Sequence, residues 1–197
     1  MVVERLGFLT SRLGRSPAKR DALARLLRAG DLPGAGWKPM SQRTWPTGAK
    51  GPDTEWGARA RAAGSLTAWR SFQNRSVRQW LWLQMAPLVS IQDAHAEFEQ
   101  IKERGLRHQG ARVKVRSERD VMVEPFAGSS KIWAFEQRIT GLGGPGENKL
   151  LVAAVNSTVI VVCSTGAPVV NWQSMAALAA KLGQRVPLTD QIKQNPE

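Results

Sequence analysis

Two short apolar runs near the C-terminus mark the most clearly buried part of the chain. Residues 150–155 form one unbroken apolar run, and residues 158–163 form a second that is rich in β-branched side chains. Because only two residues separate them, the runs predict a β-hairpin, and their near-continuous apolarity predicts that both of its faces are covered. Asn171 then offers a helix N-cap. Apolar residues follow it at spacings of three and four, as expected for a helix that covers the hairpin: Met175, Leu178 and Leu182.

The remaining pattern predicts further strands and helices. Period-two alternation or short apolar runs predict strands at residues 38–45, 65–72, 77–85, 111–116 and 131–139, of which the first is at most an edge strand. Apolar spacings of three and four, with capping residues, predict helices at residues 2–13, 16–30 and 90–105. Residues 47–55 read as a loop. This order predicts an α+β fold in which helices pack on an antiparallel sheet, with an N-terminal helical extension.

The length of the chain predicts one folded domain. A chain of 197 residues is long enough to bury a single core. We expect a basic helical arm at residues 1–30, a single α+β domain at 31–183 and a tail at 184–197. The formal net charge of +12 predicts attraction to polyanions, and the excess lies near the start, where residues 1–80 hold 15 Lys or Arg against 5 Asp or Glu.

Cysteine content and the N-terminus bear on the compartment. Cys163 is the single cysteine, so an intramolecular disulfide is excluded, which fits a reducing compartment. The first 16 residues lack the apolar segment of a secretory signal, and no run approaches the ~20 apolar residues of a membrane span. We therefore predict a cytoplasmic protein without an integral membrane segment. The basic N-terminal helix needs a partner, which is the domain body, a second copy of the chain or an anionic membrane surface.

Three features carry a resemblance to a known family. Leu32-Pro33-Gly34 and Trp37 lead into the first strand, a helix follows the tryptophan-bearing strands, and Val159-Ile160-Val161-Val162 precedes the last helix. Over residues 30–183 the chain thus resembles the Mog1/PsbP-like α+β domains of actinobacterial lipoproteins and of sensor regions of bacterial membrane kinases. The resemblance implies a binding or sensing module without enzymatic activity. Unlike the lipoprotein members, the chain has no signal peptide and no lipidation cysteine, which argues against an envelope location.

Catalytic, cofactor and metal sites are not predicted. The glycine-rich residues 141–146 lack the helix that a phosphate loop requires. His95 and Glu99 share a helix face, but His108 lies on another element, and no soft ligand joins them. Cys163 closes an apolar run, so we expect it in the core instead of in an active site. The leading hypothesis is a non-enzymatic module that binds a small ligand or a protein partner, including a second copy of itself.

Tryptophan and arginine residues in the strands at 65–85 support a nucleic-acid-binding alternative. Aromatic faces stack on bases, and guanidinium groups bind phosphates. The candidate stacking residues are Trp69, Trp80 and Trp82. The candidate polyanion-binding residues are Arg70, Arg75, Arg78, Arg112, Lys114 and Arg116. Tryptophans on central strands are more often core residues, and a second alternative is a peripheral membrane protein anchored by the N-terminal helix.

Overall fold

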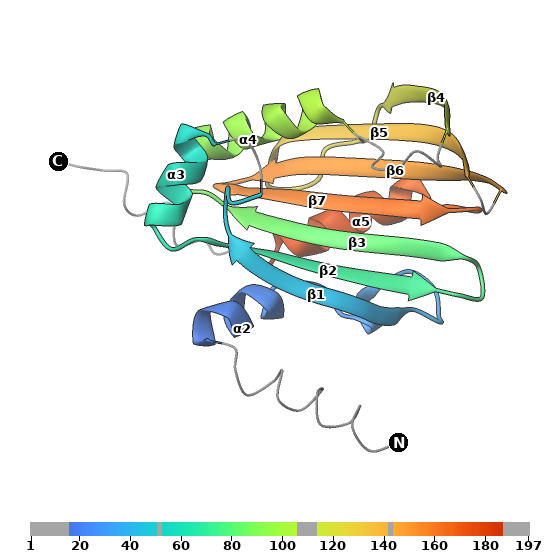
Figure 1. Ribbon diagram of the computed structural model, residues 1–197, viewed down its shortest axis with the longest axis horizontal. Helices are drawn as coiled ribbons and strands as arrows, with labels where there is room; N and C mark the ends of the chain where they lie inside the picture. Colours follow the sequence, from blue (N-terminus) through green and yellow to red (C-terminus); the bar gives the residue numbers. More distant parts are fainter. Residues whose placement is uncertain (1–15, 51–52, 106–113, 142–143, 187–197) are drawn as a thin grey trace, which may run out of the picture.

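The computed structural model describes residues 16–50, 53–105, 114–141 and 144–186. Its strands form one antiparallel sheet of seven, in the order β1-β2-β3-β7-β6-β5-β4 (Figure 1). The strands are β1 (Lys38–Pro46), β2 (Leu66–Asn74), β3 (Gln79–Pro87), β4 (Lys114–Val121), β5 (Ser129–Gly141), β6 (Gly144–Val155) and β7 (Thr158–Gly166). The helices are α2 (Pro17–Ala24), α3 (Glu55–Ala62), α4 (Ile91–Arg104) and α5 (Trp172–Gly183), with a 3₁₀ turn at Ala29–Asp31. The predicted α+β fold is confirmed.

The predicted core hairpin is the pair β6 and β7, which lies in the middle of the sheet. Leu151 opposes Val162 across the hairpin, and the chain turns at Asn156, whose φ is 50°. Because successive side chains of a strand point to opposite faces, Leu151 and Ala153 join the core on one face of the sheet, whereas Leu150 and Val152 join the core on the other. Two separate cores therefore explain why the two runs are apolar without alternation.

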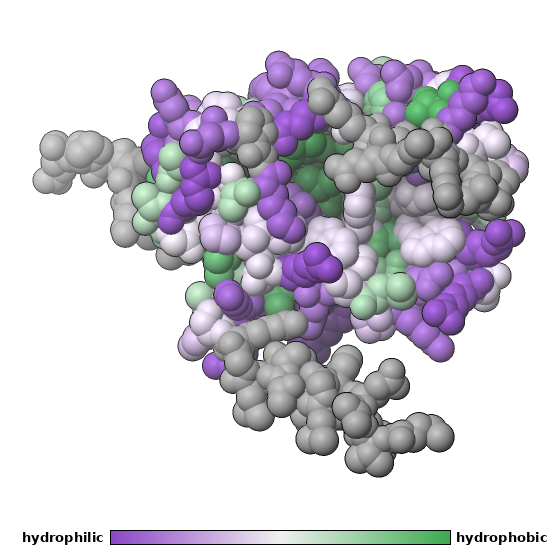
Figure 2. Space-filling view, viewed as in Figure 1, coloured by the Kyte–Doolittle hydropathy of each residue, from purple (hydrophilic) through white to green (hydrophobic). Residues whose placement is uncertain are grey.

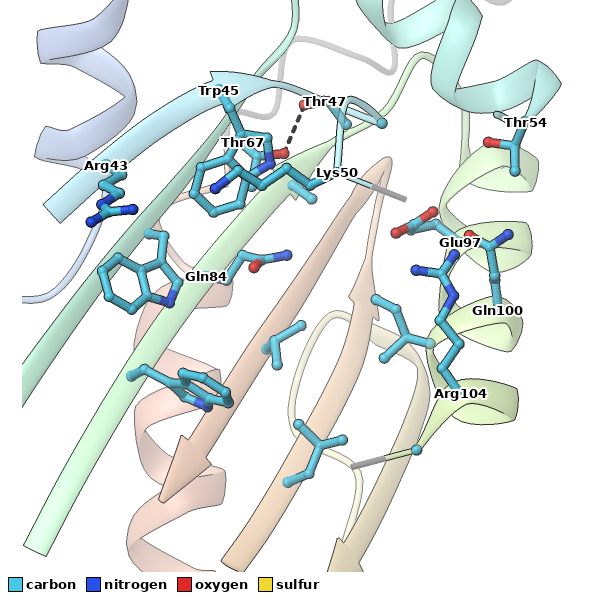
Figure 3. A pocket seen from close by; sticks show the side chains of 18 residues that line it. Arg43, Trp45, Thr47, Lys50, Thr54, Thr67, Gln84, Glu97, Gln100 and Arg104 are labelled. Carbon is cyan, nitrogen blue, oxygen red and sulfur yellow. Dashed lines mark hydrogen bonds between the residues drawn. The ribbon is translucent and has the colours of Figure 1, made fainter. Parts of the chain in front are cut away.

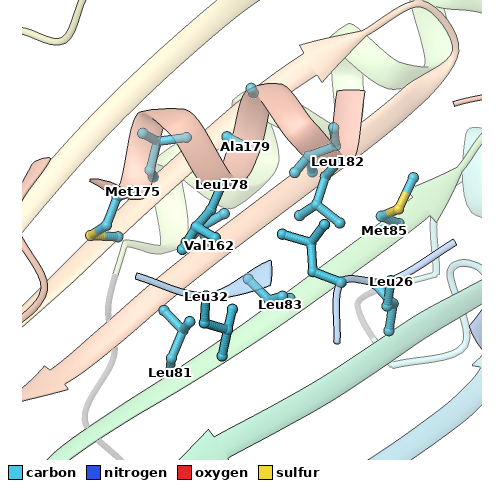
Figure 4. Close-up of a cluster of buried hydrophobic side chains, with 14 of the residues drawn as sticks. Leu26, Leu32, Leu81, Leu83, Met85, Val162, Met175, Leu178, Ala179 and Leu182 are labelled. Atoms are coloured by element: carbon cyan, nitrogen blue, oxygen red, sulfur yellow. The ribbon is translucent and has the colours of Figure 1, made fainter. Parts of the chain in front are cut away.

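Helices α5 and α2 cover the first of these faces, which we call the inner face. The Asn171 side chain accepts a hydrogen bond from the Ser174 backbone N–H, and α5 packs on β6 and β7 with its predicted stripe in the inner core (Figure 4). Helix α2 and the turn after it contribute Leu26 and Leu27, both 0% exposed, to the same core. Although these leucines fall within the predicted arm at residues 1–30, the division into arm, domain and tail stays a prediction. The helix expected at residues 2–13 lies outside the described residues.

Helices α3 and α4 lie on the other face, which we call the outer face. The Ser90 side chain caps α4 by accepting from the Asp93 backbone N–H, as predicted, and Ala94 and Phe98 are buried against the sheet. The loop predicted at residues 47–55 ends where α3 begins, but α3 itself was not predicted. Its eight residues include a glycine and three charges, so the apolar period is too weak to identify it, although Thr54 caps it in the expected way.

Asp31 connects the N-terminal and C-terminal ends of the described chain. Its carboxylate accepts a hydrogen bond from the Arg28 backbone N–H at 2.7 Å and another from Arg185 Nη2 at 3.2 Å. The Arg28 bond, helped by the Arg185 charge, lowers the pKa of Asp31 below its ordinary value of 3.8 although partial burial raises it. The ionised carboxylate therefore stabilises the fold at neutral pH.

The lowered pKa of Asp31 gives a prediction about acid stability. A group whose pKa is lower in the folded state contributes stability above its unfolded pKa, and loses that contribution as pH falls through the folded pKa. Asp31→Asn should thus destabilise the protein at about pH 6, and the difference from the unmodified protein should shrink below about pH 4. Urea unfolding at several pH values measures this difference. A gap that stays constant across the range would mean that the Asp31 charge does not contribute.

Candidate ligand pocket

A pocket of about 550 Å³ lies between helix α4 and the outer face of the sheet (Figure 3). Helix α4 packs over β5, β6 and β7, so the outer face of β1, β2 and β3 has no helix directly above it among the described elements. Figure 2, in the same orientation as Figure 1, shows apolar surface in a hollow beside α4, with hydrophilic side chains around it. The pocket therefore lies at the edge of the helical layer, between α4 and the outer face of β1, β2 and β3, which no described helix covers.

The register of the strands builds the floor of the pocket. Arg43 on β1 lies opposite Trp69 on β2, Trp69 lies opposite Gln84 on β3, and Gln84 lies opposite Val161 on β7. All four residues line the pocket. Along β3 the outward-facing Trp82 and Gln84 alternate with residues that point into the inner core, because side chains along a strand alternate between faces. The floor thus combines aromatic and amide groups with one arginine at its edge.

Helix α4 forms the opposite wall. Glu97, Gln100 and Arg104 lie at i, i+3 and i+7, so they share one face of the helix, and all three line the cavity (Figure 3). Glu97 Oε2 accepts a hydrogen bond from Trp56 Nε1 of α3 at 2.9 Å, which fixes this carboxylate against the neighbouring helix. Arg104 is different, because its Nη2 atom is buried and has no hydrogen-bond partner within the described part of the chain.

A cation and an aromatic ring meet at the end of β1. Lys50 Nζ lies 4.0 Å from the centre of the Trp45 ring, a cation–π arrangement at the rim of the pocket. Beside it the Thr47 and Thr67 hydroxyl oxygens are 3.0 Å apart and bond to each other. The described residues around the pocket therefore include three tryptophans and three cations, but a single carboxylate. They are Trp45, Trp69, Trp82, Arg43, Lys50, Arg104 and Glu97.

The structure separates the residues that were predicted to bind polyanions. Trp69 and Trp82 line the pocket, and Trp80, which is 43% exposed, lies on the same face of β3. Arg70 instead points to the inner side. Its guanidinium donates hydrogen bonds to backbone carbonyls around the end of α2, at 2.7 Å for Leu27 O and 3.1 Å for Leu23 O. Arg70 thus anchors α2 and does not extend the tryptophan surface.

The other predicted cations lie away from the pocket. Arg75 and Arg78 are exposed in the turn between β2 and β3. Lys114 and Arg116 are on the edge strand β4, four strand positions from β3 and so roughly 19 Å across the sheet. Arg112 lies outside the described residues. The predicted set does not converge on one site in the described structure.

Sequence reasoning missed the residues that complete the pocket. Arg43 and Lys50 lie in a stretch that was read as an edge strand and a loop, and Arg104 looks like an ordinary cation at a helix C-terminus. The one available signal was the alternation of Arg43 with Trp45, which places both on the same face of β1. This alternation does not show that α4 lies across the pocket from Arg43 and Trp45, because that arrangement depends on how α4 packs on distant strands of the sheet.

Other candidate chemistry is accounted for by local contacts. Cys163 is buried, and burial raises the pKa of its thiol well above the ordinary value. His95 Nε2 is 2.8 Å from Ser130 Oγ at the surface, while Glu99 pairs with Lys131. In the described ranges no three His, Cys, Asp or Glu side chains are grouped as metal ligands, and His108 is not described. Gly141 pairs with Gly144 in the β5–β6 hairpin, so the glycine-rich stretch leads into strand β6 and not into the helix that a phosphate loop requires.

Comparison with known proteins identifies a shared fold. No protein-family model and no curated protein sequence matches the chain. Among solved structures, the extracellular domain of PknH from Mycobacterium tuberculosis matches with a TM-score of 0.56 at 13% identity, over 87% of this chain and 97% of that one. An uncharacterized protein from Mycobacterium smegmatis, the Rv0999 ortholog, matches with a TM-score of 0.43 at 10% identity, over 76% and 90%. The PknH domain shares the kind of fold seen here, but the comparisons do not confirm the Mog1/PsbP-like family itself.

The comparison corrects the predicted location. The cytoplasmic prediction rested on the absence of a secretory signal, and it is contradicted by the match to an extracellular domain. Among the described residues, no helix is both long enough and apolar enough to span a membrane. An identity of 13% establishes the fold alone, so a location outside the cytoplasm is a proposal.

Proposed function

We propose that this chain is a non-enzymatic binding or sensing domain that holds a small ligand in the pocket beside α4 and acts outside the cytoplasm. Membership of the Mog1/PsbP-like class and a protein partner that responds to the bound ligand belong to the same proposal. The fold shared with the extracellular domain of PknH supports the class of function and the location. The pocket supports the choice of site.

The observation that carries the proposal is the size and lining of the pocket. Small-molecule sites are concave, measure roughly 300–1,000 Å³, and combine apolar and aromatic walls with a few polar groups. The pocket of about 550 Å³ has this character, since tryptophan, isoleucine and valine side chains form much of it and polar groups come from α4 and β1. A ligand there would contact both the sheet and α4, and so would link two layers of the fold.

A non-enzymatic role is supported by what the pocket offers. Acid–base chemistry needs a titratable group free to exchange a proton, and nucleophilic catalysis needs a nucleophile next to a base. The described residues that line the pocket include one carboxylate, Glu97, which already accepts a hydrogen bond from Trp56. They include no serine, cysteine or histidine, and the two hydroxyls of Thr47 and Thr67 bond to each other. The pocket is equipped for binding.

The proposal can be tested with a neutral ring-containing dye, N-phenylnaphthylamine, whose fluorescence rises in an apolar site. We expect saturable binding to the full-length chain. Gln84→Trp places a large side chain at a position that points into the cavity (Figure 3), so it should weaken dye binding by about tenfold or more.

Gln73→Trp is the matched control, because it makes the same exchange on β2 at a residue that does not line the pocket. Its affinity for the dye should equal that of the unmodified protein. Both variants should unfold at temperatures near that of the unmodified protein. If Gln84→Trp binds the dye as well as Gln73→Trp, the pocket beside α4 is not the binding site and the proposal fails.

A further inference from the structure

We propose that the ligand of this pocket is a small organic anion with a flat, apolar ring system, whose anionic group is bound by Arg104 and whose ring lies on the tryptophans of the sheet. The inference rests on the proposed function and adds the chemical class of the ligand. Three features of the pocket carry it: the sign of its charge, the Arg104 donor that has no partner among the described residues, and the aromatic floor.

The charge of the pocket favours an anion. Arg43, Lys50 and Arg104 line it, against the single carboxylate of Glu97. Within the described structure no ion pair joins Glu97 to any of these three, and the Glu97 carboxylate accepts a hydrogen bond from Trp56 instead. A semi-enclosed site excludes part of the solvent, so charges of one sign act more strongly on a bound ion than they do at an open surface.

Arg104 supplies a donor that is unused within the described part of the chain. Buried polar groups in proteins are nearly always hydrogen-bonded, and an unpartnered one has a cost that a suitable partner removes. The Nη2 atom of Arg104 is buried and has no partner in the described structure, and its side chain extends from the last turn of α4 into the cavity (Figure 3). A small rotation of this long side chain presents its planar fork to the cavity, where a carboxylate, sulfonate or phosphate can accept two parallel hydrogen bonds.

The floor favours a flat ring. Trp69 lies directly across from Arg43 on the neighbouring strand, and Trp82 follows on the next strand of the same face. Tryptophan rings bind other rings by stacking and by dispersion contacts over their full faces. Most of the cations are at the rim and on α4, whereas the floor is aromatic, so a ligand with an anionic end and a flat apolar body matches both.

Two dyes that differ only in charge test this inference. N-phenylnaphthylamine is neutral, and anilinonaphthalenesulfonate carries the same rings with a sulfonate. We expect the anionic dye to bind the unmodified protein about tenfold more tightly, since a charge-assisted hydrogen bond adds about that factor. Raising the salt concentration should weaken the anionic dye and leave the neutral dye unchanged.

Arg104→Met separates the anion contact from the rest of the pocket. This variant should weaken the anionic dye by about tenfold and leave the neutral dye within about twofold. Arg104→Lys keeps the charge and should recover part of the loss. Arg75→Met is the control for net charge, because Arg75 is exposed in the turn between β2 and β3 and does not line the pocket, and it should bind both dyes normally. The melting temperature of Arg104→Met should not fall, because the variant removes a buried donor that has no partner in the described structure.

Competition identifies the anionic group. Naphthoate and naphthyl phosphate carry different anionic groups on the same rings, and the better competitor against the anionic dye names the preferred group. If neither competes, or if Arg104→Met binds both dyes as the unmodified protein does, the anion inference is wrong. In that case, if Gln84→Trp still weakens the binding of the neutral dye, the proposed function is retained. If Gln84→Trp weakens the binding of neither dye, both the proposed function and the anion inference are wrong.

Discussion

Replacing Ile160 by alanine should lower the free energy of unfolding by about 2–5 kcal/mol. Ile160 is on the central strand β7, is 0% exposed, and belongs to the core between the sheet and α5. The substitution removes buried methyl and methylene groups and leaves a cavity, and the surrounding strands β3 and β6 restrict how far the site can collapse. A loss of this size is a large part of the total stability of an ordinary domain.

Urea unfolding of the Ile160→Ala protein measures this loss, and Ile91→Ala provides a matched control. Ile91 is the first residue of α4 and is 40% exposed, so the same exchange there removes less buried surface and should cost about 1 kcal/mol or less. The difference between the two variants isolates the contribution of burial on β7. Equal losses would contradict the central position assigned to that strand.

The core of the fold could be predicted from the sequence because its pattern is local. The runs at residues 150–155 and 158–163 lie on consecutive strands joined by a two-residue turn, so adjacency in sequence becomes adjacency in the sheet. Asn171 and Ser90 likewise cap helices through bonds to residues three positions further on. Such signals do not depend on how distant parts of the chain meet.

The candidate pocket depends on distant contacts, and the sequence did not predict it. Arg43 and Arg104 are 61 residues apart in the sequence, and they line one cavity because β1 pairs with β2 at one side of the sheet while α4 packs over the other. Arg70 is the reverse case: it is next to Trp69 in the sequence and was therefore predicted to share a surface with it. Adjacent residues of a strand point to opposite faces, so the two were never able to share a surface.

Helix α3 was missed for a related reason. Trp56 and Arg59 of α3 bind to Glu97 and Asp93 of α4, and Arg59 Nε is 3.3 Å from Asp93 Oδ2. These polar contacts hold a helix whose own apolar period is weak, since most helical stability in proteins comes from packing and not from propensity. The pocket also depends on this helix, because Thr54, the N-cap of α3, lines the pocket.

Gly48→Ala should destabilise the protein by about 2–5 kcal/mol, because it combines two separate costs. Gly48 has a φ of +78°, which an L side chain adopts at a cost of roughly 1–2 kcal/mol. A Cβ atom there would also lie 2.5 Å from the Cα atom of Gly57, so the turn after β1 and helix α3 would have to separate. Overpacking of this kind costs typically about 1–3 kcal/mol. Because Gly48 lines the pocket, binding of N-phenylnaphthylamine should weaken as well.

Gly64→Ala isolates the first of these costs. Gly64 has a similar φ of +70°, but nothing lies within 4 Å of the position that its Cβ would occupy. Its substitution should therefore cost only the roughly 1–2 kcal/mol of the backbone conformation and leave dye binding unchanged. Urea unfolding and a dye titration of both variants provide the comparison. If Gly48→Ala loses no more stability than Gly64→Ala and binds the dye normally, the close approach of Gly48 to α3 does not shape the pocket.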